Sequence, residues 1–240
     1  MNVGIYIHIP FCKSRCIYCG FYSTTNKELK ERYVDALIRE IHMRKDDFAR
    51  LGTSLSPSST STVYFGGGTP SSLSVCDIER IVGALESTFN GTPSEVTLEM
   101  NPDDVTKDYI KAVRQMGINR ISMGIQTFDD SRLQFIRRRH NASRAEKAVM
   151  TIREEEIHNV SIDLMFGFPN QTMDEWVTDI EKAIALHPTH ISAYSLMYEE
   201  DTPLFRMLQK GEINQIDDET NLAMYTELIN RLTANGYEHY

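Results

Sequence analysis

Three cysteines close together near the start of the chain constrain its fold and chemistry more than any other feature. Cys12, Cys16 and Cys19 have three and then two residues between them, and they directly follow an apolar run over residues 5–11. Three thiolates on one short loop can hold three irons of a [4Fe–4S] cluster, because cysteine thiolates are the usual ligands of such clusters. With no fourth cysteine nearby, one iron of that cluster is left open to bind another molecule.

Other interpretations of the cysteines fit less well. A zinc site normally takes four Cys or His ligands from two separate loops, and His8 lies in a strand-like run. A bacterial ferredoxin pattern needs a two-residue first gap and a fourth cysteine before proline, and the chain has neither. Disulfides are disfavoured by the crowding of the cysteines and by the lack of an apolar signal segment after Met1. Cys76, alone at the start of a helical pattern, is expected to be a small, half-buried apolar residue.

The composition is that of an ordinary globular protein. Its 240 residues are 41% hydrophobic and 25% charged, enough for one large α/β domain with a substantial core. No run approaches the roughly 20 apolar residues that a membrane span requires. The net charge of −9 disfavours a nucleic-acid partner. The basic cluster at residues 137–140 is most simply a solvated face.

Strand-like runs alternate with helical periodicity along the chain. Strands are predicted at residues 3–9, 63–65, 95–100, 120–126, 160–166 and 190–196, and helices at 27–50, 77–89, 106–116, 142–156, 173–186 and 218–235. A Ser/Thr-rich stretch at 53–62 is predicted to be a flexible surface connection. The alternation indicates parallel β/α units and fits a partial (β/α)6 barrel.

Several polar and glycine-rich motifs fall where predicted strands end, which is where β/α barrels carry their chemistry. The cysteine loop follows the first strand, and a Gly-Gly-Gly-Thr-Pro turn at residues 66–70 follows the second. Its backbone can approach a ligand closely and present N–H groups to a carboxylate, although a plain tight turn would look the same. Glu99 ends the third strand and Gln126 the fourth. Each needs hydrogen-bond partners there, which a ligand or a neighbouring barrel residue can provide.

The segment Tyr6-x-His8-Ile9-Pro10-Phe11-Cys12-x3-Cys16-x-Tyr18-Cys19 resembles radical S-adenosylmethionine (SAM) proteins. Within them it is similar to the family of oxygen-independent coproporphyrinogen III oxidases and related heme chaperones. This resemblance implies that the three cysteines ligate a [4Fe–4S] cluster whose open iron binds the amino and carboxylate groups of SAM. An electron from the cluster then splits SAM into methionine and a 5′-deoxyadenosyl radical, so that the cofactor carries the difficult chemistry. The resemblance also implies a radical SAM core barrel over residues 1–200 and the start of a C-terminal region over 201–240.

The resemblance further implies a set of SAM-binding residues, namely Tyr6, Tyr18, Gly67, Gly68, Thr69, Glu99, Gln126, Arg138 and Asp163. Gly67, Gly68 and Thr69 match positions that contact the methionine part of SAM. Arg138 and Asp163 could equally form a structural pair across the barrel mouth. The positions that match a second SAM site in the oxidases are Tyr18, Gly68, Thr69, Gln126, Arg138 and Asp163. The sequence leaves open whether one or two SAM molecules bind.

Two departures from the oxidase pattern favour the chaperone branch. The oxidases carry a further cysteine two residues after the third ligand, where this chain has Phe21, and an extension before the first strand. The resemblance therefore implies a chaperone that binds heme and delivers it to respiratory-chain proteins. The alternative is an enzyme that decarboxylates two propionates of coproporphyrinogen III to vinyl groups, giving protoporphyrinogen IX. A radical SAM enzyme acting on RNA or a peptide is a third option, disfavoured by the acidic charge.

The resemblance also implies partners and a compartment. We expect an electron donor such as flavodoxin or ferredoxin, a heme-acceptor protein, and a reducing cytoplasm that protects an oxygen-sensitive cluster. The chain ends at residues 236–240, within what resembles the family's next strand, so the C-terminal part in which heme is attached is expected to be missing. Seven histidines could ligate heme by chemistry alone, and no context distinguishes among His8, His42, His140, His158, His187, His190 and His239.

Overall fold

A six-stranded parallel sheet forms the centre of the computed structural model, which describes residues 3–46, 60–89 and 92–240. The strands are β1 (Val3–Ile9), β2 (Thr60–Gly67), β3 (Glu95–Met100), β4 (Arg120–Gln126), β5 (Asn159–Phe166) and β6 (His190–Ser195). Their order in the sheet is their order in the chain, and every neighbouring pair is parallel. Within the described residues β1 and β6 are the two edges, so the sheet is an open arc. This confirms the predicted α/β architecture of a partial barrel.

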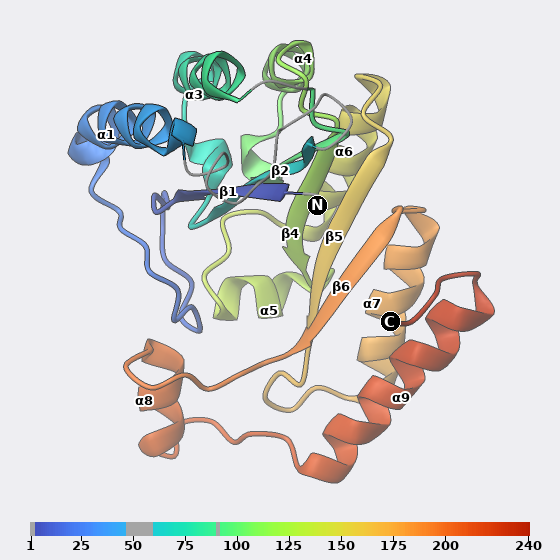
Figure 1. Ribbon diagram of the computed structural model, residues 1–240. Coiled ribbons are helices and arrows are strands. Elements are labelled where there is room, and N and C mark those ends of the chain that lie inside the picture. The colour runs from blue at the N-terminus through green and yellow to red at the C-terminus, as the bar shows by residue number, and fades with distance from the viewer. Residues whose placement is uncertain (1–2, 47–59, 90–91) are drawn as a thin grey trace.

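Helices connect the strands and cover the outer side of the arc (Figure 1). The longer ones are α1 (Lys30–Met43), α3 (Val75–Thr88), α4 (Lys107–Gln115), α6 (Ala142–Glu154), α7 (Met173–Ala185) and α9 (Asp218–Ala234). Ser74 begins α3 and Thr172 begins α7, each in a reciprocal capping box with the acidic residue three positions later. These caps explain why both helices begin close to where the sequence pattern predicts them.

The structure also differs from the prediction in its short elements. Two short helices were not predicted, α5 (Asp130–Phe135) and α8 (Pro203–Gln209), because neither is long enough to show helical periodicity. The predicted helix at 27–50 is divided into the 3₁₀ turn η1 (Lys27–Leu29), α1 and the 3₁₀ turn η2 (Arg44–Asp46). Residues 47–50 of that prediction lie outside the described residues.

The predicted connection at 53–62 is wrong at its end. Residues 60–62 belong to β2, where they pair with β1 and β3 and extend the predicted strand. Alternating Thr and Ser are polar but compatible with a strand, since β-branched threonine favours extended backbone. Residues 53–59 of the stretch lie outside the part of the chain that the structure describes.

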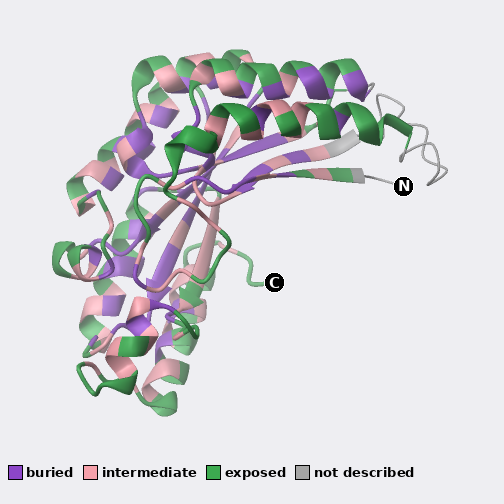
Figure 2. Ribbon diagram, turned by 90° about the vertical axis from the view of Figure 1, so that its left-hand side faces the viewer, coloured by how far each residue is buried: buried purple, intermediate pink, exposed green. Residues whose placement is uncertain are grey.

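The hydrophobic core lies between the sheet and the helices, as the buried segments in Figure 2 show. Successive strand side chains point to opposite faces, so Ile7, Ile9 and Phe65 face the helices and are buried. Alternate positions face the concave side and are mostly polar. At the far end, the fully buried Trp176 of α7 donates its Nε1–H to the carbonyl of Met224 at 2.9 Å and joins α9 to the rest of the molecule.

No helix in the described part of the chain combines the length and the apolar character that crossing a bilayer needs.

Candidate functional site

The cysteine loop leaves the carboxyl end of β1 and is held by main-chain hydrogen bonds to several segments. The Cys12 amide donates to the Thr24 carbonyl at 2.9 Å, which closes the loop on itself. The Ile17 amide donates to the Ile136 carbonyl at 3.4 Å, and the Ile17 carbonyl accepts from the Leu204 amide at 3.0 Å. The loop is therefore supported by the end of α5 and the start of α8. Its three cysteines are all free thiols and partly buried.

Two of the predicted SAM-binding residues contact the cysteine sulfurs. Thr69 Oγ1 donates to Cys12 Sγ at 3.5 Å, and Arg138 Nη1 donates to Cys16 Sγ at 3.7 Å. Burial raises the pKa of the Cys19 thiol, which the Phe21 backbone N–H partly opposes. Donors on sulfur favour the thiolate, the form that ligates iron. The sulfurs of Cys12 and Cys16 are thus each contacted by a residue from another loop.

Close packing of the glycine turn against the cysteine loop fits a cluster held between them. A Cβ on Gly68 would lie 3.0 Å from the Pro10 carbonyl carbon and 3.1 Å from Cys12 Sγ, so only glycine fits without a shift. No three His, Cys, Asp or Glu side chains of the described residues are placed to hold a single metal ion. A cubane cluster takes each thiolate on a different iron, so its ligands stand farther apart than those of one ion.

Gly67 joins the ends of the first three strands. Its φ of +115° lies in the left-handed region, and a Cβ there would meet the His8 ring at 2.7 Å. The Gly67 amide donates to Glu99 Oε2 at 3.1 Å, and the Gly68 amide donates to the Ile9 carbonyl at 2.8 Å. The sequence predicted that the N–H groups of this turn could meet a carboxylate. The Gly67 N–H meets a carboxylate of the protein itself, that of Glu99.

Glu99 is a largely buried carboxyl group on the concave face. Its Oε1 accepts from the Tyr64 hydroxyl at 2.9 Å, and the Tyr64 ring stacks on Tyr6 with centroids 5.9 Å apart. Burial raises the pKa of Glu99 to about 7, and the nearby Asp163 adds to the rise, while the hydrogen bonds from Tyr64 and Gly67 oppose it. Tyr6 is 58% exposed beside this carboxyl group and leaves one side of the site open.

Gln126 lies in a strained turn at the end of β4. Its φ is +74°, and the β4–β5 register shifts between Gly124 and Gln126. A Cβ on Gly124 would lie 2.8 Å from Gln126 Nε2 and 3.1 Å from Arg138 Nη2, and Arg138 Nη2 donates to the Gly124 carbonyl. A left-handed non-glycine residue costs free energy and is typical of functional sites. The Gln126 amide and the Arg138 guanidinium both lie close to Gly124.

Arg138 connects this turn to the cysteines. Burial alone would lower its pKa, but Tyr18 and Cys16 raise it above the ordinary value. Burial also raises the pKa of Asp163 to about 6, which the positive charge of Arg138 partly opposes. Burial likewise raises the pKa of Tyr18. The buried Arg138 Nε has no hydrogen-bond partner among the residues that the structure describes, so it is available to an acceptor.

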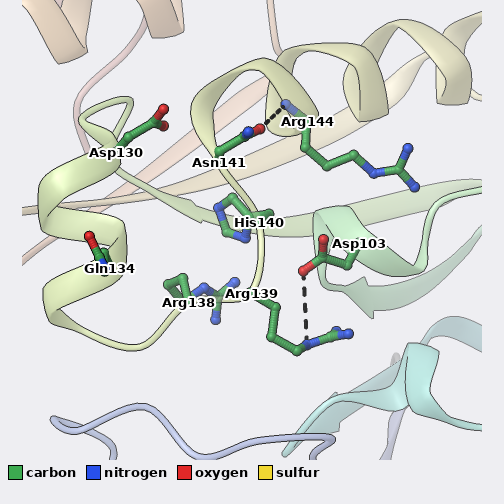
Figure 3. A pocket seen from close by; sticks show the side chains of 8 residues that line it. All are labelled: Asp103, Asp130, Gln134, Arg138, Arg139, His140, Asn141 and Arg144. Carbon is green, nitrogen blue, oxygen red and sulfur yellow. Dashed lines mark hydrogen bonds and ion pairs between the residues drawn. The ribbon is translucent and has the colours of Figure 1, made fainter.

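The basic cluster at 137–140 is therefore not simply a solvated face. Arg138 is partly buried, and His140 is only 4% exposed. Both line a pocket of about 370 Å³ between α5 and the start of α6, shown in Figure 3. His140 Nε2 bonds the Ile125 carbonyl at 3.1 Å, and burial lowers the pKa of its imidazole to about 3. The neutral ring thus supports the backbone just before Gln126.

A match to a protein-family model identifies the family of this chain. The model described as the radical SAM superfamily matches residues 6–183, which include the second half of β1, the cysteine loop, the glycine turn and strands β2 to β5. The chain belongs to the radical SAM superfamily. Superfamily membership implies a [4Fe–4S] cluster and SAM as cofactors, and the thiols, their donors and the close glycine turn fit such a cluster.

Proteins similar to this radical SAM chain include heme chaperones and a coproporphyrinogen III oxidase. The heme chaperone HemW of Synechocystis sp. is 34% identical over all of the chain and 58% of its own length. The heme chaperone HemW of Bacillus subtilis is 34% identical over 98% of the chain and 61% of its own length. The coproporphyrinogen III oxidase HemN of Escherichia coli superposes with a TM-score of 0.84 at 27% identity, over 99% of this chain and 54% of the oxidase. The chain therefore spans less than two thirds of these relatives.

The structure contradicts one prediction made from the sequence, for Cys76, and reveals one buried residue that the sequence did not single out, Asp179. Cys76 is exposed on α3, so it is not the half-buried residue that its position suggested. Asp179 of α7 was missed: its carboxylate is buried and accepts from Thr127 Oγ1 at 2.6 Å and from the Phe128 amide at 2.7 Å. An acidic residue on the otherwise apolar face of a helix was the available signal. Asp179 fixes the backbone immediately after Gln126.

Proposed function

We propose that this chain is the radical SAM core of a heme chaperone. In this proposal Cys12, Cys16 and Cys19 ligate the [4Fe–4S] cluster. The observation that carries it is the similarity to heme chaperones along essentially the whole chain. Phe21, which is 72% exposed where the resembling oxidases carry a further cysteine, supports the same choice.

Each SAM-binding role proposed here has a physical basis in the site. Thr69 and Arg138 would hold the Cys12 and Cys16 thiolates through the hydrogen bonds described above. Gly67 and Gly68 would leave room for the methionine part, and Gln126 would offer its amide. When bound, the cluster supplies one electron and SAM supplies the 5′-deoxyadenosyl radical.

The two buried carboxyl groups suit a positively charged ligand. SAM carries a sulfonium and an ammonium group, and opposite charge lowers the pKa of a carboxyl group. Burial is the main cause that raises the pKa of Glu99 to about 7 and that of Asp163 to about 6. A cation between them would therefore be bound together with the release of protons. Tyr6 and Tyr18 would line the opposite side.

The finer parts of the proposal concern the whole protein. Heme would be bound with the help of the region that the relatives have beyond this chain's span, and it would pass to a respiratory-chain acceptor. A one-electron donor such as flavodoxin or ferredoxin would reduce the cluster. A reducing cytoplasm would keep the cluster intact, because exposed thiol-ligated clusters are oxygen-sensitive.

A second candidate function is favoured by the fold. The Escherichia coli coproporphyrinogen III oxidase superposes on almost the entire chain. An oxidase would convert two propionate side chains of coproporphyrinogen III to vinyl groups with loss of carbon dioxide. Both candidates place a tetrapyrrole near the open concave face.

One anaerobic experiment separates the two. The full-length protein is reconstituted with iron and sulfide and supplied with SAM, dithionite and coproporphyrinogen III, and protoporphyrinogen IX is sought by chromatography. No product, followed by saturable heme binding in a titration, is the result expected for a chaperone. Formation of protoporphyrinogen IX would make the protein an oxidase. A Cys16→Ala variant, which should lose the cluster, controls for turnover without the cluster.

A further inference from the structure

Asp104 lies outside the set of cluster- and SAM-binding residues, yet it is the most heavily bonded carboxylate near the cysteine loop. It ends the 3₁₀ turn η4 (Pro102–Asp104), which follows the carboxyl end of β3, and its side chain is 2% exposed. Its Oδ1 accepts from Lys13 Nζ at 2.6 Å and from Arg139 Nη2 at 3.1 Å, and its Oδ2 accepts from Ser71 Oγ at 2.8 Å. Three donors from three different loops thus meet on one buried side chain.

Each of those donors lies one or two residues after a residue of the cluster site. Lys13 directly follows Cys12 in the cysteine loop. Arg139 directly follows Arg138, whose guanidinium donates to Cys16 Sγ. The third donor, Ser71, comes two residues after Thr69, whose hydroxyl donates to Cys12 Sγ. A single carboxylate therefore links the three loops that reach the sulfurs of Cys12 and Cys16.

The η4 turn that carries Asp104 is itself held by hydrogen bonds and by a proline. The Asn101 side chain caps η4, and the Asn101 backbone N–H donates to Ser71 Oγ at 3.2 Å. Pro102 occupies the first position of the turn. A buried carboxylate is stable only when its desolvation is offset by charged and neutral donors, which these partners supply. Removing the charge would leave Lys13 and Arg139 close together without the anion between them.

We propose that Asp104 is a positioning residue that fixes the Cys12 and Cys16 thiolates in the arrangement that holds the [4Fe–4S] cluster. Partners of metal ligands set the orientation of those ligands, and losing one weakens metal binding by about 10- to 100-fold. Asp104 acts one step further out, through Lys13, Ser71 and Arg139. The proposal rests on the cysteine ligation proposed above.

The neighbouring aspartate provides a matched control. Asp103 is in the same turn and has the same charge, but its Oδ2 lies 3.9 Å from Arg139 Nε and makes no hydrogen bond within the described residues. Asp104→Asn and Asp103→Asn are each introduced into the full-length protein, which is reconstituted anaerobically. The rate of iron release to a ferrous chelator and the electron paramagnetic resonance spectrum of the reduced cluster are then measured.

Asp104→Asn is expected to release iron about tenfold faster and to change the resonance spectrum. Asp103→Asn is expected to match the wild-type protein in both measurements. A merely structural role would lower the melting temperature of Asp104→Asn and leave both cluster measurements unchanged, and that result would overturn the proposal. If the wild-type protein takes up no cluster at all, the cysteine ligation fails and the proposal fails with it.

A second pair of variants keeps the test decisive if Asp104→Asn does not fold. Lys13→Met removes one of the three links at a side chain that is 39% exposed, and Arg15→Met changes another exposed cation of the same loop. Lys13→Met should release iron faster than Arg15→Met. Equal rates for these two variants would contradict the proposal. Where Asp104→Asn folds, adding Lys13→Met should increase its rate little, because the two changes break the same link.

Discussion

The protonation of the Glu99 carboxyl group makes the free energy of unfolding of the protein depend on pH. Its folded-state pKa of about 7 exceeds the ordinary value of 4.5 because burial disfavours the charged form. The fold therefore binds this proton more tightly than the unfolded chain does. The stabilising contribution of the group is complete below pH 4.5 and is lost as the pH rises through 7.

Replacing this carboxyl group should remove part of the pH dependence of unfolding. Glu99→Gln should raise the free energy of unfolding of the cluster-free protein at pH 8 by an amount on the order of 3 kcal/mol, and have little effect near pH 5. Denaturant unfolding of both proteins at the two pH values measures this. An equal difference at both pH values would show that Glu99 is not protonated in the fold near pH 5.

The cysteines differ in what their loss should do. Replacing Cys12, Cys16 or Cys19 by Ala should abolish the brown absorbance of the reconstituted protein and its cleavage of SAM, because each thiolate holds one iron. Cys76→Ala should leave both intact, because Cys76 is exposed on α3 outside the cysteine loop. Absorbance and iron content after anaerobic reconstitution check this. A Cys16→Ala protein that retained a redox-active [4Fe–4S] centre would refute the ligand assignment.

Residue patterns suggest candidate ligands more readily than they suggest the residues that contact those ligands. Cys12, Cys16 and Cys19 were recognisable because their spacing is local. The contact of Arg138 with Cys16 joins residues 122 positions apart, and only the resemblance suggested that Arg138 belongs to the site. Asp104 gave no signal, because an aspartate after Pro102 and Asp103 reads as an ordinary polar turn. Its partners become apparent only when three loops fold together.

At the scale of elements, the end of β4 carries the clearest strain. Gln126 is held in the left-handed region by its surroundings, including the bonds of Asp179 to Thr127 and Phe128 on its carboxyl side. The energy of these buried hydrogen bonds offsets the conformational cost at Gln126. Such strain persists in a fold when the side chain it places is needed there.

A glycine at position 126 should relieve this strain. It should weaken SAM binding without lowering the stability of the fold. Gln126→Gly accepts the positive φ at little cost, so the melting temperature of the cluster-free protein should stay the same or rise. SAM binding by the reconstituted protein should weaken by about tenfold, the equivalent of one lost hydrogen bond. Gln126→Ala is the comparison, because it loses the same amide and keeps the strained backbone. Equal SAM affinity in all three proteins would show that the Gln126 amide does not contact SAM.

Elements with strong periodicity were predicted well. The strands at 95–100 and 120–126 have the predicted bounds, because apolar runs between polar turns are typical of buried parallel strands. The helix α5 was missed because it has six residues and one buried apolar residue, Leu133. Its start at Asp129 is a proper cap, but an isolated cap without periodicity does not distinguish a helix from a turn.

At the scale of the whole molecule, the buried Trp176 ring is one of the links between α9 and the rest of the protein, beside the Asn221–Ser195 hydrogen bond and the Arg231–Glu181 ion pair. Trp176 packs against Phe166 of β5 with centroids 5.1 Å apart and donates to the Met224 carbonyl of α9. One side chain thus connects the sheet, α7 and the last helix. The stability of residues 218–234 should follow the packing of Trp176 more closely than the helix propensity of α9 itself.

Removing the Trp176 ring should make α9 unfold locally while the sheet stays folded. Trp176→Ala should lower the free energy of unfolding by about 4 kcal/mol, the usual cost of deleting a buried aromatic side chain. Amide exchange should accelerate most in α9 and least in β1 to β3. Leu222→Ala, on the same helix but 66% exposed, should change stability by less than about 0.5 kcal/mol. Uniform acceleration across the sheet would show that α9 does not open independently.

The open arc of the sheet gives the molecule a freedom of shape that a closed barrel lacks. A closed barrel ties its strand number, tilt and stagger together, so its bore is set once the chain has folded. Within the described residues no strand pairing joins β1 to β6, so the twist between neighbouring strands adds up from one edge of the sheet to the other. The distance between the cysteine loop after β1 and the end of β6 is therefore set by the accumulated twist of the strand pairings and by the helices that pack on them.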